Sequence, residues 1–238
     1  MHKLFVSGCS FSDYTLVKHN WGELLSDMLG MQYVHMNRGG GSNDRTWRET
    51  AWKILEGEIT SDDVVIAQYT NLNRREFGAT ELDYNPTDEM GKEKFDTRLG
   101  TFYTTAFKFD SHMWQNNDWD VKLHAAYEHT GGISDAYCLS HFYTQHSMFD
   151  SLCKQNNIKI IYMGTRYLES DIEITGTHVF NEHHHMPVVS PDDTMLGHHP
   201  DHPAQDEYDS AHLSQFGHEL LARHVEQYIA ENGVLGRV

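Results

Sequence analysis

Short apolar runs alternate with segments of helical periodicity through the first third of the chain. The runs predict strands over about 3–7, 32–36 and 64–68, and the segments between them predict helices over about 19–29 and 44–56. The third run is apolar without a break, which is typical of a parallel strand that helices cover on both faces. This pattern predicts an α/β fold in which a parallel sheet lies between two layers of helices.

The pattern continues in the second half of the chain. A helical stripe predicts a helix over about 134–155, and the apolar run after it predicts a buried strand over 158–163. Ser214 is a suitable N-cap for a final helix, and Gly233 is a suitable residue just past its end. The apolar face of that helix consists of Leu220, Leu221, Val225, Tyr228 and Ile229. Because no internal repeat or low-complexity linker interrupts the sequence, we expect a single domain over 1–238.

Two stretches break this regularity. Residues about 76–133 follow the third predicted strand and contain Pro86, Gly91 and Gly100 among scattered aromatic residues, so that no helical or alternating register fits them. Residues about 177–208 are rich in His, Asp and Pro. We expect an irregular insertion at the first stretch and a solvated, His-rich loop at the second.

Charge and composition narrow the class of protein. The chain of 238 residues carries 18 Lys and Arg against 35 Asp and Glu, which gives a net charge of −17 with neutral histidines. This charge repels nucleic-acid phosphates and anionic lipid headgroups, so we expect neither nucleic acid nor a membrane as a partner. No apolar run is long enough to span a bilayer, no secretory signal precedes the first strand, and three irregularly spaced cysteines favour a reducing compartment. We therefore expect a cytoplasmic protein.

A serine near the start of the chain and an acid–histidine pair near its end suggest nucleophilic catalysis. Ser10 lies in a Gly-Cys-Ser-Phe-Ser turn directly after the first strand, and Asp209 precedes His212 by three residues. A serine hydroxyl becomes a good nucleophile when a histidine removes its proton and an acid fixes the tautomer of that histidine. Because active sites gather at the carboxyl ends of parallel strands, the predicted fold can bring these segments together.

These segments resemble the SGNH, or GDSL-like, hydrolases, a family named for four blocks that bear Ser, Gly, Asn and His. The first block matches the turn around Ser10, and the last block matches Asp209-x-x-His212 before a terminal helix. The resemblance implies a flavodoxin-like sheet, with Ser10 as nucleophile, His212 as base and then acid, and Asp209 as the residue that orients His212. It implies that Ser10 also lends its backbone N–H to the oxyanion hole, and that no cofactor is required. The implied substrate is an ester, with an O-acetyl ester of a carbohydrate as the first candidate.

The two middle blocks match over fewer residues. The segment 37–43 resembles the second block, and its spacing favours Gly40 as the glycine whose backbone N–H binds the oxyanion. In the third block only Asn71 matches, as a side-chain amide donor, since Tyr69 and Leu72 replace the glycine and aspartate of the family. The resemblance therefore implies an oxyanion hole formed by Ser10, Gly40 and Asn71.

The Gly-Cys-Ser-Phe-Ser segment near the start and the altered third block resemble SGNH-type proteins encoded by bacteriophages, in which an arginine follows the third block. Here that residue is Arg74, a candidate for binding an anionic group of the substrate or, alternatively, for anchoring a loop. The altered third block leaves a second class of function open. In that alternative, the chain is a virion-associated binding or structural module that keeps the fold without catalysis.

Cys9, the glycine run around Gly40 and the histidines of 177–208 each suggest a different kind of site. Cys9 adjoins Ser10 and is a rival nucleophile, although packing in the core is the simpler role for a thiol at this position. The glycine run around Gly40 suits a phosphate-binding loop, but the Gly-Lys-Ser/Thr of such loops does not follow it. The histidines of 177–208 suit metal-dependent hydrolysis, but their spacing matches no zinc motif, so the predicted site contains no metal.

Overall fold

A parallel sheet of five strands forms the centre of the molecule. The computed structural model describes residues 2–9, 12, 18–37, 41–72, 74–79, 101–106, 135–165, 168, 172–181, 213 and 215–236. The strands of the sheet are β1 (Lys3–Ser7), β2 (Gln32–His35), β3 (Val64–Tyr69), β6 (Lys159–Gly164) and β7 (Val179–Asn181). They lie in the order β2-β1-β3-β6-β7, and every pair is parallel. This is the flavodoxin-like order of a doubly wound sheet, which confirms the predicted α/β fold.

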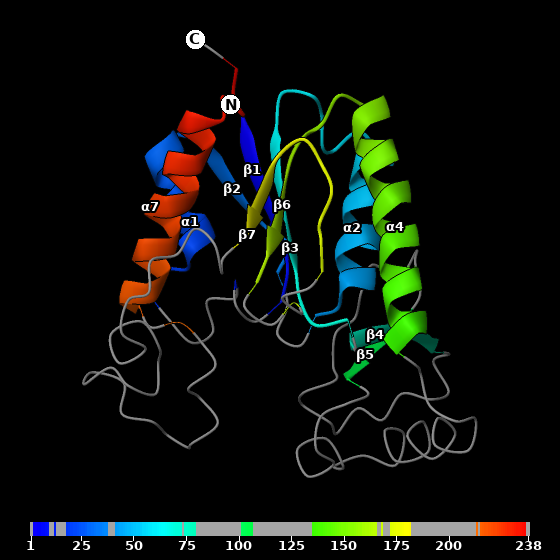
Figure 1. Ribbon diagram of the computed structural model, residues 1–238. Helices are drawn as coiled ribbons and strands as arrows, with labels where there is room; N and C mark the ends of the chain where they lie inside the picture. The colour runs from blue at the N-terminus through cyan, green and yellow to red at the C-terminus, as the bar shows by residue number, and fades with distance from the viewer. Residues whose placement is uncertain are drawn as a thin grey trace.

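Helices cover both faces of the sheet. They are α1 (Trp21–Leu29), α2 (Asn43–Leu55), α4 (Asp135–Gln155) and α7 (Gln215–Glu231). Figure 1 shows α1 and α7 side by side on one face and α2 and α4 side by side on the other. The two termini of the described chain lie at the same end of the molecule, opposite the carboxyl ends of the strands (Figure 1).

Successive residues of each strand serve two different cores, because side chains alternate between the faces of a sheet. Leu4 and Val6 of β1 pack with the helices α1 and α7, whereas Phe5 packs with α2 and α4. In β3, Ile66 belongs to the first core and Val65 to the second. Both are fully buried, as expected for a parallel strand between helix layers.

Side-chain caps set the first residues of α1 and α2. Asn20 Oδ1 accepts the Glu23 N–H at 2.9 Å, so α1 begins at Trp21 and not near residue 19 as its periodicity predicted. Ser42 Oγ accepts the Arg45 N–H at 3.2 Å in the same way at the start of α2.

The prediction of a wholly irregular insertion over 76–133 is wrong at its described residues. An antiparallel pair, β4 (Arg74–Ala79) and β5 (Thr101–Ala106), forms a separate two-stranded sheet. The register places Phe77 opposite Tyr103. Pairing with a neighbouring strand stabilises a strand whose own alternation of apolar and polar residues is weak. A stretch of sequence that contains only one of the two strands does not reveal this pairing. The rest of the insertion lies outside the described residues.

The predicted irregular loop over 177–208 also begins with regular structure. Its residues Val179–Asn181 form β7, which pairs with β6 and buries Phe180 completely. Three residues are too few for a periodic pattern, so the strand was not predicted from the sequence. The histidine-rich remainder, 182–208, lies outside the described residues.

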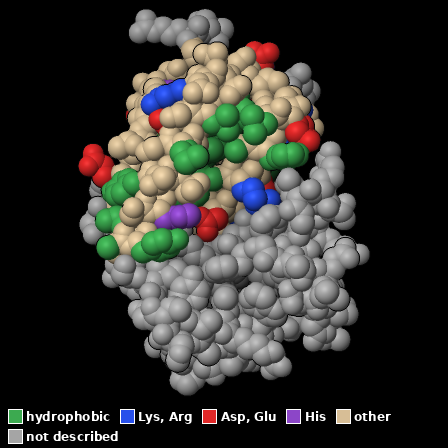
Figure 2. All heavy atoms as spheres, turned by 90° about the vertical axis from the view of Figure 1, so that its right-hand side faces the viewer, with side chains coloured by type: hydrophobic (Ala, Val, Ile, Leu, Met, Phe, Trp, Pro, Cys, Tyr) green, Lys and Arg blue, Asp and Glu red, His purple; other side chains and the backbone are tan. Residues whose placement is uncertain are grey.

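Figure 2 shows the face of the molecule that α2 and α4 cover. Apolar side chains form separate groups on it, with acidic, basic and histidine side chains between them (Figure 2). Large exposed apolar side chains of α4 include Tyr137, Leu139 and Met148. Within the described ranges, no helix combines the length and hydropathy that crossing a bilayer requires.

Candidate active site at the carboxyl edge of the sheet

The winding of the chain reverses between β1 and β3. The connection from β1 to β2 passes through α1 on one face, and the connection from β2 to β3 passes through α2 on the other. In open α/β sheets, ligands bind outside the carboxyl ends of the strands at such a switch point. Ser10 follows β1 in the sequence and Asn71 follows β3. The predicted nucleophile and the predicted amide donor thus come from the two strands that flank this point.

The structure describes two of the predicted site residues, Asn71 and Arg74. The other four lie outside the described residues: Ser10, Gly40, Asp209 and His212. Each of these is next to a described residue or separated from one by a short segment. The described neighbours are Cys9 and Ser12, Gly41, and Leu213. The surroundings of these neighbours are therefore the part of the site that can be built from contacts.

A hydrogen bond joins the described residues on either side of the predicted nucleophile. Ser12 N–H donates to Cys9 O at 3.1 Å, which is the i to i+3 bond of a tight turn. The residues between these two in the sequence are Ser10 and Phe11. Cys9 itself is 1% exposed. This burial favours packing as the role of the thiol over its role as a rival nucleophile.

Ser12 is held by two buried side chains. Trp21 Nε1 donates to Ser12 Oγ at 2.9 Å, and Ser12 Oγ donates to Gln68 Oε1. Gly8 lies against the same glutamine: a Cβ on Gly8 would stand 2.6 Å from Gln68 Oε1 and 2.9 Å from Gln68 Cβ. Atoms do not approach so closely, so the end of β1 requires glycine at this position.

Asn37, just past β2, completes this polar group. Its Nδ2 donates to Ser12 O at 3.0 Å and to the Tyr33 hydroxyl at 3.1 Å. Among the described residues, three buried polar atoms at this edge have no hydrogen-bond partner: Gln68 Nε2, Asn37 Oδ1 and Thr70 Oγ1. Buried polar atoms without a protein partner are available to water or a ligand.

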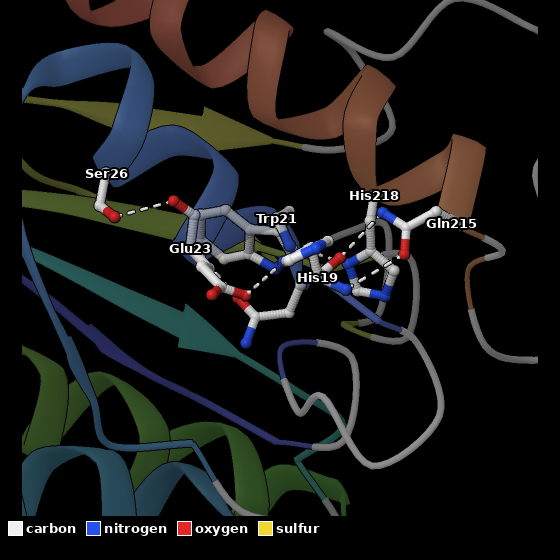
Figure 3. A network of polar contacts seen from close by, with 7 residues as sticks. His19, Trp21, Glu23, Ser26, Gln215 and His218 are labelled. Carbon is white, nitrogen blue, oxygen red and sulfur yellow. Dashed lines mark hydrogen bonds and ion pairs between the residues drawn. The ribbon is translucent and has the colours of Figure 1, made fainter.

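The start of α7 is fastened to the start of α1, as Figure 3 shows. His19 N–H donates to Gln215 Oε1 at 3.1 Å, and Gln215 Nε2 returns a hydrogen bond to His19 O at 3.1 Å. Trp21 N–H donates to His218 Nδ1 at 3.0 Å, so Nδ1 of this buried histidine carries no proton. Leu213, next to His212 in the sequence, is buried in the same core. These contacts hold the segment that follows His212 against the segment that follows Ser10.

The segment after β3 is fastened to the start of α2. Thr70 N–H donates to Asn43 Oδ1 at 2.8 Å, and Asn43 Nδ2 donates to Thr70 O at 2.9 Å. Arg74 Nη1 donates to Gly41 O at 3.4 Å. Asn71 is half-buried between these two connections. The contact between Arg74 and Gly41 agrees with the alternative that Arg74 anchors a loop. Binding of a substrate anion by Arg74 stays a prediction.

A buried hydrogen-bond chain lies on the α2 and α4 side of β3. Trp47 Nε1 donates to Tyr69 Oη at 3.0 Å, and Tyr69 Oη lies 2.9 Å from His146 Nδ1. His146 Nε2 lies 2.6 Å from Thr175 O. Because a carbonyl oxygen only accepts, Nε2 carries the proton and Nδ1 accepts from the Tyr69 hydroxyl. Burial lowers the pKa of His146 and raises the pKa of Tyr69, so both side chains are neutral.

Tyr69 stands where the resemblance described above predicts the glycine of a third block. Its ring packs among the aromatic rings of Trp47, Phe142 and Tyr162. It is fully buried, on the face of β3 that α2 and α4 cover. The side chain at this position is therefore a core residue.

Sequence reasoning missed several residues that build this edge. They are Trp21, Asn37, Gln68, Gln215 and His218. One signal was present: Gln68 is the polar residue in the otherwise apolar run of β3, and a buried polar side chain needs a partner. The contacts of Gln215 and His218 join residues almost two hundred positions apart, as the His19–Gln215 separation of 196 shows. No local pattern carries such information.

The metal alternative is not tested by these contacts. Across the described ranges, no group of three or more His, Cys, Asp or Glu side chains is arranged to hold a metal ion. The histidines of 182–208 lie outside these ranges.

One of the solved structures that match the chain is similar to it over almost its whole length. It comes from Desulfitobacterium hafniense DCB-2 and is described as a "putative lipolytic protein of G-D-S-L family". The similarity covers 96% of this chain and 99% of that chain, at 10% sequence identity and a TM-score of 0.48. No protein-family model matches the chain, and no curated protein sequence matches it.

Proposed function

We propose that the protein is a serine hydrolase of the SGNH type that cleaves a carboxylic ester by acyl transfer to Ser10. The observation that supports this most directly is the position of Trp21. Its side chain binds Ser12, two residues after Ser10, and its backbone N–H binds His218, six residues after His212. One residue thus joins the segments of the predicted nucleophile and the predicted base.

The reaction follows from the roles of these residues. Ser10 Oγ attacks the carbonyl carbon of the ester while His212 takes the hydroxyl proton and Asp209 stabilises the imidazolium. His212 then gives that proton to the departing alkoxide, which leaves as an alcohol. Water, activated by His212, releases the acid from Ser10 and restores the enzyme. The oxyanion of each tetrahedral intermediate binds the backbone N–H groups of Ser10 and Gly40 and the side-chain amide of Asn71.

The charge of the chain favours an uncharged ester as substrate. A net charge of −17 repels anionic molecules over a distance of about one Debye length, roughly 8 Å at physiological ionic strength. Arg74, the cation nearest the third block, binds the Gly41 carbonyl. An O-acetyl ester of a neutral carbohydrate meets this condition, and we propose this substrate class.

Turnover of p-nitrophenyl acetate tests the proposal. Ser10→Ala and His212→Ala are expected to lower kcat by roughly 10³-fold or more, because each removes a member of a unit that acts together. Cys9→Ala is the matched control and is expected to keep the activity, since the thiol is buried. Addition of EDTA is expected to leave the wild type active.

Three results would overturn the proposal. Turnover that persists in Ser10→Ala and disappears in Cys9→Ala would make the thiol the nucleophile. Loss of activity in EDTA would indicate metal-dependent hydrolysis through the histidines of 177–208. Absence of turnover in a folded wild type, both with p-nitrophenyl acetate and with O-acetylated oligosaccharides, would favour the non-catalytic binding module.

A further inference from the structure

Asn43, the first residue of α2, holds the backbone of Thr70 with both ends of its side-chain amide. Thr70 N–H donates to Asn43 Oδ1 at 2.8 Å, and Asn43 Nδ2 donates to Thr70 O at 2.9 Å. Both residues are buried, so water does not compete for these bonds. A pair of antiparallel hydrogen bonds fixes the orientation of the Thr70 backbone as well as its distance from α2.

A second connection lies on the other side of Asn71. Arg74 N–H donates to Asn71 O at 3.3 Å, which closes a turn, and Arg74 Nη1 donates to Gly41 O at 3.4 Å. Asn71 therefore lies between two attachments to the segment 41–43. The first attachment acts directly before Asn71 in the sequence, and the second acts three residues after it.

The amide of Asn43 is not needed to cap α2. Ser42 is the N-cap, and its Oγ accepts the Arg45 N–H at 3.2 Å. The Asn43 side chain points instead to β3, where its two bonds are made across 27 positions of sequence. Ser42 already caps the helix, and the Asn43 amide binds both the N–H and the C=O of one distant residue, so its role is to hold Thr70.

We infer that Asn43 is a positioning residue for the oxyanion hole. The inference rests on the proposed function, in which Gly40 and Asn71 donate to the same oxyanion. Asn43 follows Gly40 by three residues and binds the residue directly before Asn71. It thereby fixes the start of α2, which follows Gly40 in the sequence, and the segment that bears Asn71 relative to each other. Donors stabilise a developing oxyanion only when they are already in place, and Asn43 supplies this preorganisation without touching the substrate.

The first test compares Asn43→Ala with Ser42→Ala, in kcat, KM and unfolding by urea. Ser42→Ala removes the cap of α2 and leaves Thr70 bound, whereas Asn43→Ala keeps the cap and releases Thr70. Asn43→Ala is expected to lower kcat about 10- to 100-fold with KM nearly unchanged, because a small displacement of a donor acts on the transition state. Ser42→Ala is expected to lose stability through its cap and to keep most of its kcat.

The second test uses pH. In Asn43→Asp, one carboxylate oxygen still accepts the Thr70 N–H, but the other faces Thr70 O, which is also an acceptor. Protonation of that buried carboxyl restores the missing donor, and burial raises its pKa. The ratio of the kcat of Asn43→Asp to that of the wild type is therefore expected to rise as the pH falls from about 8 to about 5.5. Dividing by the wild-type kcat at each pH removes the pH dependence that the two enzymes share.

The outcomes separate this inference from the proposed function. If the wild type shows Ser10-dependent turnover, but Asn43→Ala loses no more kcat than Ser42→Ala, the positioning role is overturned and the hydrolase remains. A pH-independent ratio for a folded Asn43→Asp would overturn it as well. If the wild type shows no Ser10-dependent turnover, the proposed function fails and this inference fails with it.

Discussion

The two faces of the sheet hold the candidate site in different ways. On the α1 and α7 face the core is mostly aliphatic, and the paired hydrogen bonds between Gln215 and His19 are only partly buried. On the α2 and α4 face, hydrogen bonds run through the interior from Trp47 through Tyr69 to His146. A buried hydrogen bond is costly to break because no water replaces the lost partner, whereas a partly exposed one is replaced at little cost. Variants of the second face should therefore lose more stability, and edge variants of the first should lose more activity than stability.

The largest effect is expected at Gly8, where β1 approaches Gln68 of β3. In Gly8→Ala the new Cβ would stand 2.6 Å from Gln68 Oε1, so strand and side chain must move. We expect a loss of about 1–3 kcal/mol in the free energy of unfolding, and a loss of kcat of up to about 10²-fold because Ser10 is two residues away. Urea unfolding and p-nitrophenyl acetate turnover measure the two quantities.

The cause of that loss is tested by a second substitution. Gln68→Ala removes the carboxamide that the new Cβ meets, so the double variant is expected to lose less stability than the sum of the two single variants. Strict additivity would contradict the steric explanation.

The next largest effect is expected on the α2 and α4 face. Tyr69→Phe removes one hydroxyl and leaves two buried partners, Trp47 Nε1 and His146 Nδ1, without their hydrogen bonds. We expect the free energy of unfolding to fall by about 1–3 kcal/mol, measured by urea unfolding. Tyr143→Phe is the matched control, because Tyr143 is a half-buried tyrosine of α4 that takes no part in the hydrogen bonds from Trp47 to His146. Equal losses of unfolding free energy in both variants would show that the buried hydrogen bonds of Tyr69 add nothing to stability.

On the α1 and α7 face, Gln215→Ala removes the paired bonds to His19. Because this contact is only partly buried, we expect a loss of about 0.5–1.5 kcal/mol in stability. The relative loss of kcat should be larger than in Tyr69→Phe, since Gln215 holds the segment next to His212. Gln227→Ala removes an exposed glutamine of the same helix and should change neither quantity. A Gln215→Ala enzyme with unchanged kcat would contradict a positioning role for this contact.

The smallest effect concerns pH. Burial holds the pKa of His146 below its usual value of 6.5, so the unfolded chain takes up this proton before the folded chain does. The contribution of His146 to stability is therefore complete above about pH 6.5 and declines as the pH falls below it. His146→Gln does not titrate, so the stability difference between the wild type and this variant should shrink on acidification. A difference that stays constant from about pH 8 to about pH 5.5 would contradict a pKa of His146 that folding lowers.

The sequence was sufficient where the structure depends on local pattern. The strands over 3–7 and 64–69 centre on short apolar runs, and the predicted Gly233 lies just past the end of α7 with a left-handed backbone. It was insufficient where structure depends on a distant partner. The strand Arg74–Ala79 needs Thr101–Ala106 beside it, and β7 has only three residues.

The same division holds for the candidate site. Ser10, Asp209 and His212 could be proposed from the sequence because nucleophile, acid and base have characteristic short motifs, and their roles stay predictions. The residues that hold their neighbours in place have no motif. Trp21 and Gln215 are ordinary helix residues in the sequence, and their roles depend on α1 and α7 lying side by side.

Covalent labelling of the nucleophile tests the central claim most directly. The wild type, Ser10→Ala and Cys9→Ala are each treated with a fluorophosphonate, and the modified peptide is identified by mass spectrometry. The account predicts a single adduct on Ser10 in the wild type and in Cys9→Ala, and none in Ser10→Ala. An adduct on another residue, or an unmodified Ser10 in a folded wild type, would contradict it.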